Sequence, residues 1–189
     1  MSYSIPAKHS SLESWLTEIV EASDWYRTLI DIRDLDLPDW WVAGGAVRTT
    51  VWCHLYRSDC NLKIKDIDVI FFDEKTARET ELAAKKKLSM IHQNWLFDVK
   101  NQSSFGVWRN WPWKFTDTID GIAHFLHTAT AVGVKLDRQG ILQIAQPYGL
   151  DDLFSGVIRR TPFRQEDGAA QRKQLEYMNG CCRLRAEEF

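Results

Sequence analysis

Two short stretches, WWVAGGAVR at residues 40–48 and KDIDVIFF at residues 65–72, decide the fold of this chain. The apolar run at 40–43 stops at Gly44-Gly45, which predicts a buried strand followed by a turn. Residues 46–56 then carry apolar side chains four positions apart, so we expect a helix there. Asp66 to Phe72 is rich in β-branched and aromatic residues, which predicts a second strand.

The second strand begins with two carboxylates, Asp66 and Asp68. Side chains at positions i and i+2 of a strand leave the same face, so the two carboxylates converge while Ile67 anchors the other face in the core. The pair is costly unless a cation or a basic partner neutralises it. Hard oxygen ligands suit Mg²⁺ or Mn²⁺. Taken alone, the tripeptide is weak evidence for a metal site, because two aspartates near the start of a strand are more often solvated or capping groups.

The glycine turn before the first helix has the features of a phosphate site. Gly44 and Gly45 let the backbone approach a ligand closely, and the helix N-terminus offers free N–H donors. Arg48, three residues further on, adds a charged donor for a phosphate oxygen. The first turn is therefore predicted to bind triphosphate oxygens, while the next strand holds the metal ions that bridge them.

A third strand, at residues 95–100 (WLFDVK), carries one acidic residue among large apolar ones. Asp98 faces opposite to Phe97 and Val99, and its two interpretations are a third metal ligand or a salt bridge. Lys100 points the same way, and it either neutralises a phosphate or pairs with Asp98.

The rest of the chain places these motifs in an α/β or α+β layout, a small mixed sheet with flanking helices. Residues 12–20 carry a helical apolar stripe, for which Ser10 or Ser11 is the N-cap. We expect a short helix or turn before Pro38, helices at 75–90 and 118–130, the latter with Thr116 as a cap, and strands at 131–136 and 141–145. We divide the chain into three segments. A helical segment covers 1–38, a core with a turn-rich stretch from 147 covers 39–163, and a polar tail with a last helix covers 164–189.

The composition of the chain excludes several classes of protein. The chain has 189 residues, a formal net charge of −2 and a pI near 6.2, which argues against a surface that coats nucleic acid. No apolar run approaches the ~20 residues that span a bilayer, and the first residues lack a signal peptide's apolar stretch. We therefore expect a cytoplasmic protein that does not bind membranes, with its four cysteines reduced.

Several other residues have two interpretations. Residues 103–115 form a tryptophan-rich irregular loop, in which packing is favoured over base stacking. Thr128 and Thr130 either contact a ribose or base, or cap local structure, and local capping is favoured. His124 and His127 are spaced for a metal pair on a helix, but a structural role is favoured.

With these motifs in view, the sequence resembles the nucleotidyltransferase superfamily of DNA polymerase β. The Gly-Gly followed by Val and Arg is similar to tRNA CCA-adding enzymes and poly(A) polymerases. More closely, a set of small bacterial proteins known as nucleotidyltransferase family proteins shares an ordered series of motifs with residues 40–163. These are GGAVRTTVW, DIDVIFFD, FDVKNQ, TATAVGVKL and PYGLDDLF.

The resemblance implies the polymerase β-type fold and transfer of a nucleoside monophosphate from an NTP to a hydroxyl acceptor. It also implies that Asp66, Asp68 and Asp98 carry the metal. Thr49 stands where CCA-adding enzymes have an acidic residue, so we expect an acceptor that is a small molecule rather than RNA or protein. The alternatives are a catalytically silent nucleotide- or metal-binding regulatory module and an RNA-modifying enzyme in a complex. The full set of carboxylates favours activity, and the acidic pI disfavours the RNA enzyme.

Overall fold

The computed structural model describes residues 9–75, 78–104 and 114–188, and the strands in those ranges form two sheets. The larger has five strands in the order β3-β2-β1-β4-β5. β1 is antiparallel to both of its neighbours, whereas β2 and β3 run parallel. The strand bounds are β1 Trp41–Ala43, β2 Ile67–Phe71, β3 Phe97–Asn101, β4 Gly133–Leu136 and β5 Leu142–Ala145. This arrangement confirms the predicted mixed sheet.

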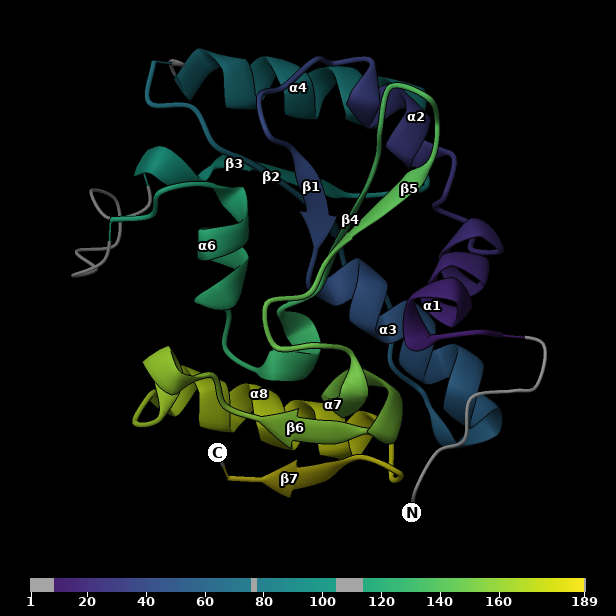
Figure 1. Ribbon diagram of the computed structural model, residues 1–189. Helices are drawn as coiled ribbons and strands as arrows, with labels where there is room; N and C mark the ends of the chain where they lie inside the picture. Colours follow the sequence, from purple (N-terminus) through teal and green to yellow (C-terminus); the bar gives the residue numbers. More distant parts are fainter. Residues whose placement is uncertain (1–8, 76–77, 105–113, 189) are drawn as a thin grey trace.

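Helices surround this sheet, and Figure 1 shows them on several sides of it. Helix α4 crosses the top of the view, and α8 lies at the bottom beside the small sheet. The helix bounds are α1 Leu12–Glu21, α2 Thr28–Arg33, α3 Gly45–Tyr56, α4 Arg78–Ile91, α6 Thr118–Ala123, α7 Asp151–Ser155 and α8 Gly168–Gly180. None of the helices in the described ranges is long and apolar enough to span a membrane.

One apolar cluster joins the two ends of the chain to the sheet. It contains Trp15 of α1, Val69 of β2 and Leu184 near the C-terminus, all of them buried. Helix α1 reaches this core through the predicted apolar stripe, and Ser11 caps it by accepting a hydrogen bond from the Ser14 N–H. This core extends across residues 38 and 163. The division of the chain into three segments at those residues stays a prediction.

The strand that carries the acidic pair alternates as predicted. Ile67, Val69 and Phe71 are completely buried on one face, while Asp68 lies on the other face and is partly exposed. Asp66 directly precedes β2 instead of opening it. The apolar face fixes the strand in the core, so the acidic face is aimed by packing rather than by contacts of its own.

The predicted helix at 118–130 is wrong in extent and in its cap. Helix α6 ends at Ala123, and its N-cap is Asp117, which accepts from the Asp120 N–H, instead of Thr116. Tertiary hydrogen bonds end the helix early: Thr161 donates its N–H to the Leu126 carbonyl and its hydroxyl to the Phe125 carbonyl. The segment continues into a 3-10 turn, η3, at Thr128–Thr130.

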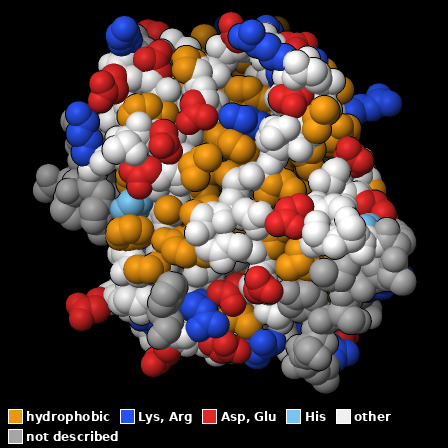
Figure 2. Space-filling view, viewed as in Figure 1, with side chains coloured by type: hydrophobic (Ala, Val, Ile, Leu, Met, Phe, Trp, Pro, Cys, Tyr) orange, Lys and Arg blue, Asp and Glu red, His pale blue; other side chains and the backbone are white. Residues whose placement is uncertain are grey.

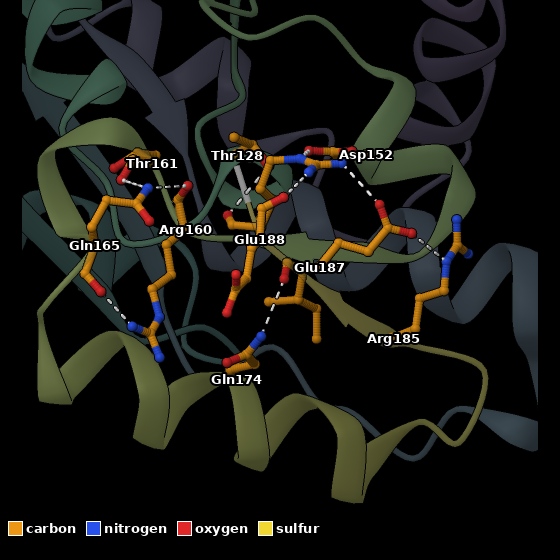
Figure 3. Close-up of polar contacts among 11 residues, drawn as sticks. Thr128, Asp152, Arg160, Thr161, Gln165, Gln174, Arg185, Glu187 and Glu188 are labelled. Atoms are coloured by element: carbon orange, nitrogen blue, oxygen red, sulfur yellow. Dashed lines mark hydrogen bonds and ion pairs between the residues drawn. The ribbon is translucent and has the colours of Figure 1, made fainter.

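The C-terminal residues contain more structure than the predicted tail with a helix. Strand β7, Arg185–Glu187, pairs in parallel with β6, Val157–Arg159. Figure 3 shows how polar contacts connect this small sheet to η3. Asp152 of α7 accepts a 2.6 Å hydrogen bond from Thr128 and a 3.1 Å one from Arg159, whose guanidinium also pairs with Glu187. The Thr128 hydroxyl therefore has a structural contact with a distant element, α7, instead of the local capping that the sequence favoured.

Candidate active site

The three aspartates lie together at one place on the sheet. β2 and β3 are parallel neighbours whose register places Asp68 directly beside Asp98, and Asp66 precedes β2 on the same side. One carboxylate oxygen from each residue lies within 4.8 Å of the others, a spacing at which they can hold a metal ion. Parallel pairing therefore brings together carboxylates that are 30 residues apart in sequence.

Negative charge accumulates in this cluster. Burial, and after it the charges of Asp66 and Asp98, raise the pKa of the Asp68 carboxyl to about 7, against the lowering effect of Lys100 and Arg48. Lys100 forms an ion pair with Asp98, which is the salt bridge that the sequence offered as one interpretation of both residues. Two cationic side chains do not fully compensate three carboxylates, and a cation bound among them would relieve the remaining repulsion.

The glycine turn points the start of α3 at the same cluster. Gly44 has a φ of +73°, a left-handed conformation that disfavours any side chain. A Cβ placed at Gly44 would lie 3.1 Å from the Phe125 ring and 3.8 Å from an Asp68 carboxylate oxygen. At Gly45 the corresponding distance to Asp68 is 3.9 Å. The missing side chains thus leave the first N–H groups of α3 open beside the carboxylates.

Arg48 is held rigidly between aromatic rings. Its guanidinium carbon lies 4.1 Å from the centre of the Tyr177 ring and 5.4 Å from that of Trp52, and the side chain is largely buried. One terminal nitrogen donates to the Thr49 hydroxyl at 2.9 Å. The Nε atom is buried without a hydrogen-bond partner among the described residues. A buried donor without a partner costs stability in the free protein and suits a ligand that supplies an acceptor.

These elements line a cavity of about 520 Å³. It contains all four of the predicted phosphate-site residues and one of the aspartates: Gly44, Gly45, Arg48, Lys100 and Asp68. The other lining residues are Ile70, Gln102, Phe115, Gly121, His124, Phe125, Leu126, Thr130, Arg164, Asp167, Ala169 and Tyr177. The wall thus combines charged and polar groups with aromatic rings, as small-molecule sites do.

The sequence patterns did not predict the residues after position 160 that line this cavity. Arg164 is 4% exposed, donates to the His124 carbonyl and pairs with Asp167, and both residues line the cavity. Tyr177 on α8 supplies the ring on which the Arg48 guanidinium stacks. In sequence these residues read as a polar tail. Only the burial of a long charged side chain identifies them, and burial is not visible in sequence.

The remaining candidates have local roles. Thr130 donates to the His127 carbonyl, and the His124 ring stacks on Phe163 at 3.7 Å while its Nδ1 lies 2.8 Å from the Asp120 carbonyl oxygen. These contacts favour packing over a histidine metal pair. The tryptophans at 108, 111 and 113 lie outside the described residues, as does most of the predicted 103–115 loop.

Comparison with known proteins agrees with this geometry. A protein described by its NMR structure as a CCA-adding enzyme head domain is 27% identical, with a TM-score of 0.77 over 97% of this chain and 98% of that one. The Thermotoga maritima CCA-adding enzyme complexed with tRNA is 14% identical, with a TM-score of 0.60 over 92% of this chain and 42% of its own. A CCA-adding enzyme with CTP is 18% identical, with a TM-score of 0.59 over 93% and 43%, respectively.

The two complexes show the fold alone, because this chain spans less than half of their length and shares few residues with them. Among curated proteins, none matches this sequence. The model of a nucleotidyltransferase family, however, matches residues 31–185, which is most of the chain. The predicted fold and family are thereby confirmed, and the chain belongs to this nucleotidyltransferase family as an enzyme of that class.

Proposed function

We propose that this enzyme transfers a nucleoside monophosphate from an NTP to a hydroxyl acceptor and releases pyrophosphate. The observation that carries the proposal is the meeting of three carboxylates within 4.8 Å beside the open N-terminus of α3. The same cavity contains anion-binding donors and aromatic walls, which suit a triphosphate and a base.

Asp66, Asp68 and Asp98 would hold the divalent cation, Mg²⁺ or Mn²⁺. The donor set fits: the three residues offer only oxygen ligands. Burial, and after it the charges of Asp66 and Asp98, raises the pKa of Asp68, so a cation there would stabilise its ionised form. Metal ions at such a site activate an attacking hydroxyl and stabilise the departing oxygen. The rigid placement of the aspartates comes from the buried face of β2, so little reorganisation accompanies binding.

The remaining polar groups bind the triphosphate. The first N–H groups of α3 follow Gly44, which lies beside Asp68, and phosphate oxygens accept from such donors with the help of the helix dipole. Arg48 supplies its unpartnered Nε, and stacking on Tyr177 fixes its orientation. Lys100 forms an ion pair with Asp98, and it can exchange that contact for a phosphate oxygen.

The acceptor is a small molecule in this proposal. Acidic and basic side chains are interspersed around a central apolar area on the face shown in Figure 2, unlike a nucleic-acid-binding surface. Thr49 accepts a hydrogen bond from Arg48 at the position where CCA-adding enzymes have an acidic residue. We place the protein in the cytoplasm, where its four free cysteines would stay reduced.

Calorimetry of NTP binding with and without Mg²⁺ tests the metal site. We expect the metal to strengthen binding in the parent protein and to have no effect in Asp66→Ala or Asp68→Ala, with the fold checked by circular dichroism. Folded variants that bind the Mg²⁺–NTP complex as tightly as the parent would show that these aspartates do not hold the metal.

A further inference from the structure

A second cavity, of about 430 Å³, adjoins the first at the carboxylates. Gly45, Arg48, Asp68 and Tyr177 line both cavities, whereas Asp66 lines only the second. Lys100 and the phenylalanines line only the first. The acidic cluster therefore stands where two separate compartments meet, and each compartment has its own set of side chains.

The wall of the second cavity beyond the aspartates is basic. It contains three lysines and one acid: Lys63, Lys65, Lys173 and Glu176. Glu176 holds Lys65 at 2.6 Å and Lys173 at 2.8 Å, and both lysines lower the pKa of Glu176 to about 2. Lys63 is exposed and forms no ion pair within the described ranges. One acid among three lysines leaves an excess of positive charge, with Lys63 available to a ligand.

The chemistry of the proposed reaction needs two compartments of this kind. In an in-line displacement the attacking oxygen and the leaving oxygen lie on opposite sides of the phosphorus. The first cavity has the triphosphate donors and the aromatic walls, so it suits the NTP. An acceptor in the second cavity would approach the α-phosphorus from the side of Asp66, away from Lys100.

We propose that the second cavity is the acceptor site and that the acceptor is a small hydroxyl compound bearing a phosphate group. This inference rests on the proposed nucleotidyl transfer. Lys63 and the Glu176-held lysines bind the phosphate group, and the hydroxyl at the other end of the acceptor lies beside Asp66 and Asp68. A volume of about 430 Å³ suits a small molecule, and the mixed charge of the wall suits a compact anion.

The step balances without a further reactant. The acceptor oxygen forms a bond to the α-phosphorus of the NTP, and the bond from that phosphorus to the bridging oxygen of the β-phosphate breaks. Pyrophosphate departs with the electron pair, and the proton of the acceptor hydroxyl passes to solvent water. The product is a phosphodiester between the nucleoside monophosphate and the phosphorylated acceptor.

Amide NMR spectra of the full chain test this assignment, with Mg²⁺ and a non-hydrolysable ATP analogue present in excess. Glycerol 3-phosphate is the probe and glycerol its uncharged counterpart. We expect glycerol 3-phosphate to shift the signals of residues 61–65 and 173–180, and glycerol to leave them unchanged. Lys63→Ala should weaken the binding about tenfold, the effect of losing one charge-assisted hydrogen bond. Lys86→Ala, an exposed lysine on α4 at the other end of the molecule, should not change it.

Three results would overturn the assignment. The first is no shift at the second cavity, or equal shifts with glycerol. The second is a shift of these residues by the ATP analogue that glycerol 3-phosphate cannot extend, because the lysines would then bind the nucleotide's own phosphates. The third is tighter binding of a single-stranded oligoribonucleotide at the same residues. If the analogue leaves Gly44 and Gly45 unchanged, the proposed function fails instead, and that signal is independent of the probe.

Discussion

Replacing Asp68 by asparagine should stabilise the metal-free protein while it removes the proposed activity. Burial and two neighbouring carboxylates raise the pKa of Asp68 from 3.8 to about 7. An acid with a raised pKa binds more protons when folded than when unfolded, so its cost appears as pH rises from about 4 to about 7 and stays constant above. Asparagine keeps the shape of the side chain and never carries the charge.

The size of the effect follows from that shift. About three pKa units at 1.36 kcal/mol each give a ceiling of ~4 kcal/mol. Because Asp68 is partly exposed, solvent screens part of the repulsion, and we expect about 2 kcal/mol at pH 8. At pH 4 the gain should be close to zero, because most of the parent's Asp68 is then protonated when folded.

Urea unfolding of the parent and of Asp68→Asn, at pH 4 and pH 8 with EDTA, measures both values. Asp137→Asn is the matched control. The Asp137 carboxylate accepts hydrogen bonds in the turn between β4 and β5, so this replacement should destabilise the protein. Adding Mg²⁺ at pH 8 should then stabilise the parent more than Asp68→Asn. If Asp68→Asn is less stable than the parent at pH 8, the carboxylate cluster is not repulsive and the electrostatic reasoning is wrong.

Three further predictions concern the surroundings of the site. Arg48→Lys keeps the charge but loses the planar fork stacked on Tyr177, so calorimetry should show NTP binding weakened about tenfold with the fold intact; unchanged affinity would remove Arg48 from the triphosphate site. Gly44→Ala should destabilise the fold by about 1–2 kcal/mol more than Gly140→Ala, as measured by urea unfolding, because both glycines have positive φ but only Gly44 faces a ring at 3.1 Å. Equal losses would mean that the Phe125 ring moves aside freely. His127 is fully buried, and burial lowers its pKa from 6.5 to about 4, so the unfolded chain gains the proton first and stability falls as pH drops from about 6.5 to about 4. The parent should lose up to ~3 kcal/mol relative to His127→Phe over that range; parallel pH curves of urea unfolding for the two proteins would refute it.

The part of the site that sequence predicted depends on local signals. A run of apolar residues, two glycines and an arginine one turn later determine the β1-turn-α3 unit within nine residues, and strand alternation fixes the face of Asp68. Asp98 joins Asp68 through the parallel pairing of β2 and β3, a contact between distant segments that the local patterns do not determine. The proposed roles of these residues stay predictions, because geometry alone does not test them.

What sequence missed depends on contacts between distant segments. Helix α6 ends at Ala123, and just beyond it Thr161 donates hydrogen bonds to the Phe125 and Leu126 carbonyls, a contact across more than thirty residues that no helical period encodes. Strand β7 exists only because β6 offers a parallel partner. Arg164 and Tyr177 reach the cavity for the same reason: Arg164 donates to the His124 carbonyl and Tyr177 packs on Arg48 of α3, and polar composition gives no sign of either contact.

An NTP carrying radioactive α-phosphate, incubated with the enzyme, Mg²⁺ and a cell extract, shows directly whether the nucleoside monophosphate is transferred. We expect the label to enter a new small-molecule product and pyrophosphate to appear in equal amount. Asp66→Ala, Asp68→Ala and Asp98→Ala should each abolish the transfer. Transfer of label from the γ-phosphate instead, or undiminished α-transfer by the folded aspartate variants, would contradict it.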